Sequence, residues 1–129
     1  MLPGFSIETK PLTELEIKLL PVVVKGLSKK LGAANAVSNK AICEGLNKTC
    51  NVVVSEARIR KIINYIRMND LVPGLVANGC GYYISTNPDE VKEYIKSLHG
   101  RELAIKGIRE KTQAYLKHLL GNYQSSFFK

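Results

Sequence analysis

The chain has 129 residues, 45% of them apolar, and a formal net charge of +8, which suits one small globular domain with an appended element. Its longest apolar run, residues 19–24, is interrupted by Pro21 and is far shorter than the roughly 20 residues that cross a bilayer. Three cysteines and two histidines lie at spacings that fit neither a disulfide framework nor a metal site, and residues 1–10 lack a secretory signal. We therefore expect a cytoplasmic protein that spans no membrane, holds no cofactor and, given its charge, has a polyanionic partner.

The first helix is predicted to begin at Thr13, just after Pro11. Thr13 and Glu16 have the spacing of a capping box, and apolar residues then recur at three- and four-residue steps. Pro21 either kinks this helix or begins a second one. The sequence LGAAN, residues 31–35, predicts the end of the helical region because its glycine suits a left-handed cap.

Two further helices are predicted before residue 70. Ser38 is a candidate N-cap for a short helix over residues 38–46, and Ser55 is a candidate N-cap for a helix that ends near residue 68. The loop between them, residues 47–54, is longer than the three- or four-residue turn of a simple helix-turn-helix. The core side of the second helix is predicted to comprise Ile59, Ile62, Ile63 and Ile66.

Polar and basic residues lie roughly opposite these isoleucines at 100° per residue. Arginine and lysine can reach guanine acceptors, asparagine can pair with adenine, and a small residue such as Ala57 allows close approach to a groove. Free N–H groups at the helix start suit a phosphate. The alternative is an ordinary helix with a solvated polar face. The predicted outward set is Ser55, Ala57, Arg58, Arg60, Lys61 and Asn64.

A tight β-hairpin is predicted over residues 75–85, because two apolar runs are separated by the turn sequence NGCG. Pro73 implies that the first strand is short or at an edge. Tyr82 and Tyr83 alternate across the second strand, so we expect one to be buried and the other more exposed.

A last helical region is predicted from the sequence NPDE, residues 87–90, with asparagine as N-cap and proline at the first helical position. Gly100 is a candidate break. Beyond it, steps of three and four residues alternate as in a coiled-coil seam, through Ile105, Ile108, Thr112, Tyr115 and Leu119, although threonine is a poor seam residue and a helix that packs on its own domain fits equally well. The candidate dimerisation residues are Leu98, Ile105, Ile108, Tyr115 and Leu119.

The order helix, short helix, basic helix, hairpin is that of a winged helix-turn-helix domain. The sequences RIRKIINYIRMNDLV, NDLVPGLV and GYYI also resemble the recognition helix and wing of that family, most closely in small proteins of bacteriophages and bacterial mobile elements. The resemblance covers residues 12–86. It implies a mostly α fold with a small β-hairpin: a winged helix-turn-helix over residues 1–87, a C-terminal helical extension over 88–120 and a frayed tail over 121–129.

The resemblance further implies sequence-specific binding of double-stranded DNA, in a regulatory role or in replication of a phage or mobile element. Helix 55–68 would enter the major groove, Lys40 would contact phosphates, and the uncharged hairpin tip would use backbone N–H groups at Asn78 and Gly79. A homodimer would present two such helices to a two-fold site. The alternative is a winged-helix adaptor that binds protein instead of DNA. We expect no enzyme, because no phosphate-binding loop, metal-ligand set or nucleophile–base pair is recognisable.

Overall fold

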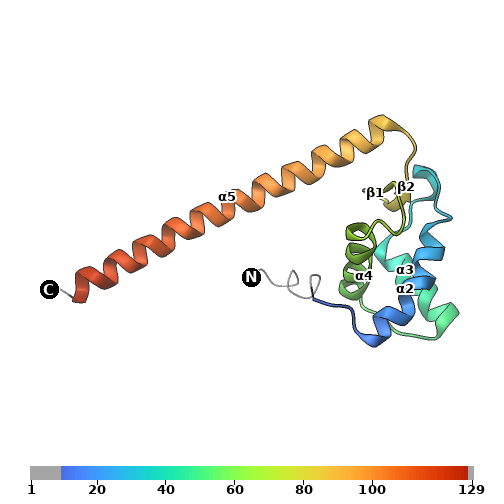
Figure 1. The fold of residues 1–129 in the computed structure, drawn as a ribbon, viewed down its shortest axis with the longest axis horizontal. Helices are drawn as coiled ribbons and strands as arrows, with labels where there is room; N and C mark the ends of the chain where they lie inside the picture. The colour runs from blue at the N-terminus through green and yellow to red at the C-terminus, as the bar shows by residue number, and fades with distance from the viewer. Residues whose placement is uncertain (1–9, 128–129) are drawn as a thin grey trace. The chain divides into compact units, whose positions relative to one another are not determined.

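The computed structural model describes residues 10–127 and divides the chain after Val91 into two compact units. The first unit is helical with a two-stranded antiparallel hairpin, which confirms the predicted mostly α fold with a small β-hairpin (Figure 1). In chain order the elements are α2 (Glu14–Leu27), a 3₁₀ turn (Ala33–Asn35), α3 (Asn39–Cys50), α4 (Glu56–Met68), β1 (Leu75–Asn78), β2 (Gly81–Ile84) and α5 (Pro88–Phe127).

Helix α2 begins with the predicted capping box. The Thr13 hydroxyl accepts a hydrogen bond from the Glu16 N–H, and the Glu16 carboxylate accepts one from the Thr13 N–H at 2.8 Å. Pro21 lies inside one continuous helix. The helix ends at Leu27, earlier than the predicted exit at 31–35, because residues 30–32 leave it to hydrogen-bond with β2.

Helix α3 has the predicted N-cap, since the Ser38 hydroxyl accepts a hydrogen bond from the Ala41 N–H. It continues to Cys50, beyond the predicted end at residue 46, because Cys50 also packs against the core. Asn51 then ends the helix in a left-handed conformation with φ 53°. The predicted long loop over 47–54 is therefore wrong: the connection to α4 is only residues 51–55.

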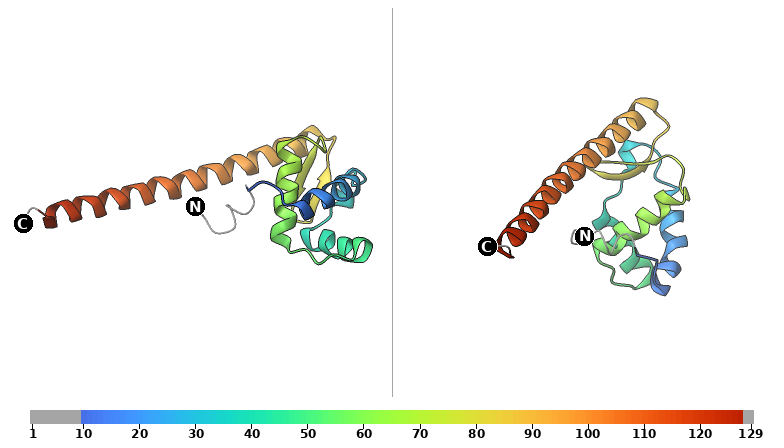
Figure 2. Two further views of the ribbon diagram at one scale, coloured as in Figure 1. Left: turned by 60° about the horizontal axis from the view of Figure 1, so that its bottom comes forward. Right: turned by 60° about the vertical axis from the view of Figure 1, so that its left-hand side comes forward.

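Helix α4 supplies the centre of the core. Its four isoleucines have no exposed surface, as predicted, and each contributes about 1.5–3 kcal/mol by burial. Side chains from α2, α3 and the hairpin pack around them, and Figure 2 shows these elements grouped together. The residues that pack with α4 include Leu19, Val23, Leu27, Leu46, Leu75 and Tyr82.

Strand β2 is hydrogen-bonded along both edges. On one side it pairs with β1 in the register Leu75 with Ile84 through Asn78 with Gly81, which leaves a two-residue turn. On the other side Val37 and Tyr82 exchange hydrogen bonds of 2.8 and 2.9 Å, and the Ile84 N–H donates to the Lys30 carbonyl at 2.7 Å. The hairpin is thus tied to the segment that joins α2 to α3.

Both tyrosines of β2 are buried, so the expectation that one would be more exposed is wrong. Tyr82 faces the core, and the Tyr83 hydroxyl on the other face donates to the Glu90 carboxylate at 3.1 Å. Burial and this carboxylate raise the pKa of Tyr83. Ser85 donates to the same carboxylate at 2.8 Å, so the first turn of α5 is fixed to the hairpin.

Helix α5 is a single helix with the predicted cap: the Asn87 side chain accepts a hydrogen bond from the Asp89 N–H at 2.9 Å. Gly100 does not interrupt it. The helix continues to Phe127, which corrects the frayed tail predicted from residue 121; residues 128–129 lie outside the described part of the chain. Within residues 10–127 no helix has the length and apolar character to cross a membrane.

We expect Gly81→Ala to destabilise the first unit by about 2 kcal/mol or more. Gly81 has φ 131°, and a Cβ there would lie 2.2 Å from the Val37 carbonyl oxygen, so the pairing of β2 with residue 37 would have to open. Urea unfolding measures the loss. Gly79→Ala is the matched control, because a Cβ at that position meets no atom within 4 Å. Equal stability of the two variants would contradict the proposed constraint.

Candidate nucleic-acid interface

The start of α4 is fixed by Ser55 and by the residue before it. The Ser55 hydroxyl accepts a hydrogen bond from the Arg58 N–H at 3.2 Å, and Val54 is buried in the core. The predicted cap is therefore present, and its hydroxyl oxygen is used within the protein. Because α4 is held at its first turn and along its isoleucines, its remaining side is presented as a rigid surface.

Lys61 does not lie on that surface. Its side chain is 5% exposed, and its ammonium group donates to the Glu16 carboxylate at 2.6 Å. The prediction that Lys61 faces outward is wrong, because the first turn of α2 places a buried carboxylate against α4. A buried charge requires a partner of opposite sign, and these two residues supply one to each other.

Glu16 is the centre of a small charged cluster. One oxygen of its carboxylate accepts hydrogen bonds from Lys61 and from the Thr13 N–H, and the other oxygen lies 3.8 Å from Arg58 Nε. Burial raises the pKa of Glu16, but the hydrogen bonds from Lys61 and Thr13 outweigh it and bring the pKa below its usual 4.5. The carboxylate therefore stays ionised, and it draws Arg58 toward α2 while leaving that side chain 41% exposed.

Two residues of the predicted outward set, Arg60 and Asn64, lie on the solvent-facing side of α4. Arg60 is exposed and Asn64 is partly buried one turn later. Among the described residues, the Asn64 side chain has no hydrogen-bond partner, so its amide can still donate and accept toward a ligand. Ala57 is partly buried one turn before Arg60, and its short side chain leaves room for a ligand to approach the helix backbone there.

Arg67 is a basic residue of α4 that the sequence interpretation missed. Its guanidinium lies 5.8 Å from the centre of the Tyr82 ring, a cation–π distance. The contact links the end of α4 to the hairpin. The residues are far apart in the sequence, so periodicity within α4 gives no signal for this contact.

The other predicted contacts lie on separate elements. Lys40 is exposed in the first turn of α3, and Asn78 and Gly79 are exposed at the hairpin tip. The Asn78 side chain accepts a hydrogen bond from the Cys80 N–H at 2.8 Å, so it stabilises the turn. The structure thus brings Arg58 and Lys61 together at Glu16, sets Arg60 and Asn64 one turn apart, and keeps Lys40 and the tip on other parts of the unit.

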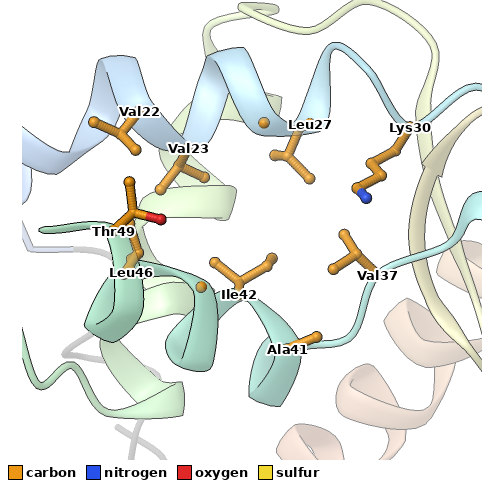
Figure 3. Close-up of a pocket in the computed structure, with 11 residues that line it drawn as sticks. Val22, Val23, Leu27, Lys30, Val37, Ala41, Ile42, Leu46 and Thr49 are labelled. Carbon is orange, nitrogen blue, oxygen red and sulfur yellow. The ribbon is translucent and has the colours of Figure 1, made fainter.

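A second surface feature is an apolar cavity of about 240 Å³ between α2 and α3. Figure 3 shows valine, leucine and isoleucine side chains of the two helices facing each other, with Lys30 at one end and Thr49 at the other. Among the described residues, its lining supplies a single titratable group, the Lys30 amine, and no carboxylate, thiol or imidazole. Such a lining suits an apolar group and offers no acid–base pair for catalysis.

We expect Lys61→Met to lower the free energy of unfolding by about 3 kcal/mol, because it leaves the Glu16 carboxylate buried without its closest cation. The double variant Glu16→Gln/Lys61→Met removes both charges and keeps a residue that fits a capping box, so it should recover most of the loss. Urea unfolding of the wild type, both single variants and the double variant measures the coupling. Lys18→Met, at an exposed position of α2, is the control. A loss at Lys61 no larger than at Lys18 would show that the pair has no stabilising role.

The same cluster predicts a dependence of stability on pH. The pKa of Glu16 is lowered in the folded protein. The ionised carboxylate therefore contributes fully to the free energy of unfolding above pH 4.5, and this contribution is lost as the pH falls through the pKa that Glu16 has in the folded protein. Unfolding free energies measured across that acidic range should decline less steeply for Glu16→Gln than for the wild type. Parallel curves for the two proteins would contradict the assignment.

The chain was compared with known proteins in three ways. The scan against protein-family models found no match, and the searches of curated proteins and of solved structures also found none.

Proposed function

We propose that the first unit is a winged helix-turn-helix that binds double-stranded DNA in a sequence-specific manner. The observation that carries the proposal is the order α2, α3, α4 and hairpin with α4 anchored at its N-cap and along its core side. The connection over residues 51–55 supports it, because it is close to the short turn of a helix-turn-helix. The role that best fits is regulation, or replication of a phage or mobile element, in the cytoplasm.

In this proposal α4 enters the major groove with the side that carries Arg60 and Asn64. Asn64 pairs with an adenine edge and Arg60 with a guanine edge or a phosphate. Arg58, half exposed beside Glu16, and Lys40 on α3 contact phosphates. The role of Lys61 is revised: it orients α4 against α2 and does not touch DNA.

The charge of the whole chain supports the same conclusion. A net charge of +8 gives a favourable long-range interaction with a duplex and should speed association. The neutral hairpin tip contributes the backbone N–H group of Gly79 rather than ionic contacts. Affinity is therefore expected to depend on the few basic residues of α3 and α4.

The test begins with selection of bound sequences from random duplexes by the full chain. Affinity for the enriched duplex is then measured by fluorescence anisotropy at roughly 50 and 200 mM salt, where several phosphate contacts predict a steep decrease. Arg60→Glu should weaken binding about tenfold or more. Asn64→Ala should cost on the order of 1–3 kcal/mol and relax discrimination at one base pair.

One variant serves as the control. Lys18→Glu changes the charge as Arg60→Glu does, but at an exposed position of α2, and should change affinity much less. No enriched motif, or equal effects of Arg60→Glu and Lys18→Glu, would exclude the proposed surface and favour the protein-interaction adaptor.

A further inference from the structure

Helix α5 carries an exposed apolar stripe along the second unit. The side chains of the stripe are between 42% and 61% exposed, a large fraction for leucine, isoleucine and tyrosine. They occupy five of the seven a and d positions of a heptad repeat over residues 98–119, and Arg101 and Thr112 occupy the other two. The stripe comprises Leu98, Ile105, Ile108, Tyr115 and Leu119.

Four charged residues interrupt or border this stripe. With Leu98 and Ile105 at position a, Arg101 occupies a d position, Glu102 and Arg109 occupy successive e positions beside the seam, and Lys111 occupies a g position. Glu102 is 79% exposed. Because Glu102 and Arg109 are two helical turns apart on one helix, they cannot pair with each other within a chain. Their placement therefore constrains what can cover the stripe.

A parallel pairing of two α5 helices does not satisfy these charges. It would place Arg101 of one chain against Arg101 of the other inside the seam. The e residues would meet the g residues five positions earlier on the second chain, and these are the neutral Ser97 and Ala104. The parallel arrangement thus has a repulsive layer and no compensating ion pair.

An antiparallel pairing has one register that pairs Glu102 with Arg109 and sets Arg101 opposite Thr112 rather than opposite a second arginine. When Ile105 lies opposite Ile108 of the second copy, Leu98 lies opposite Tyr115 and Glu102 lies opposite Arg109, each contact occurring twice by symmetry. A shift by one heptad in one direction sets Glu102 against Glu102, and a shift in the other direction sets Arg109 against Arg109. Charge complementarity therefore selects a single register.

We propose that the apolar stripe of α5 is covered by the same stripe of a second copy of this chain, antiparallel, with Glu102 of each copy paired with Arg109 of the other. The paired segment is residues 94–119, about 39 Å of helix. In this arrangement the N-terminal ends of the two α5 helices lie at opposite ends of the pair. The inference does not depend on DNA binding.

The test is the self-association of the full chain, measured by sedimentation equilibrium in reducing buffer so that exposed Cys80 cannot crosslink. The wild type should be a dimer. Glu102→Arg sets arginine against arginine twice, and Arg109→Glu sets glutamate against glutamate twice, so each should raise the dimer Kd about tenfold or more. The double variant Glu102→Arg/Arg109→Glu restores both ion pairs and should dimerise like the wild type.

A mixture of the two single variants gives the sharpest result. A heterodimer of the Glu102→Arg chain and the Arg109→Glu chain contains two arginine–glutamate pairs, so the mixture should associate more tightly than either chain alone. Glu110→Arg, which makes the same charge change at an outward f position, is the control and should not alter the dimer. Circular dichroism verifies that every variant keeps its helix.

Three outcomes would overturn the proposal: a wild-type chain that stays monomeric, an effect of Glu110→Arg equal to that of Glu102→Arg, or no recovery in the mixture and the double variant. Because no DNA is present, none of these outcomes bears on the proposed duplex binding. Conversely, loss of binding in Arg60→Glu would leave the dimer unchanged.

Discussion

The buried ion pair between Glu16 and Lys61 links the two helices on which the first unit depends. The Glu16 carboxylate completes the capping box with Thr13 and also accepts the hydrogen bond from Lys61, so one side chain fixes both the start of α2 and its position against α4. Two charges in the interior are costly unless each meets the other with good geometry. The 2.6 Å contact supplies that geometry and acts together with the packing of the four isoleucines of α4.

The pair also determines the electrostatics of the proposed DNA surface. It removes one lysine from the outward side of α4 and holds Arg58 near a carboxylate, so the surface is less positive than the basic sequence of α4 implies. The proposed DNA surface of α4 is therefore smaller than the sequence predicted, and its centre is formed by Arg60 and Asn64. A surface of this kind depends more on a few directed contacts than on a broad positive patch.

The hairpin is held to the rest of the first unit by contacts with three other segments. Gly81 permits the close approach to the Val37 carbonyl, Arg67 lies over the Tyr82 ring, and Tyr83 is hydrogen-bonded to Glu90 at the start of α5. The first turn of α5 thus belongs to the first unit, which ends at Val91. Beyond Val91 the helix exposes an apolar stripe that its own described contacts do not cover.

The sequence by itself determined the features that depend on neighbouring residues: the caps at Thr13, Ser38, Ser55 and Asn87, the buried isoleucines of α4, and the hairpin turn. Each of these features is determined by residues within one or two helical turns of it, or within a single hairpin. Only the tertiary structure decided that Lys61 is buried, that α3 extends to Cys50 and that Tyr83 is covered. Helical periodicity places Lys61 opposite the core, but a carboxylate 45 residues away reverses that placement. Periodicity describes one element, whereas burial depends on whichever other element packs against it.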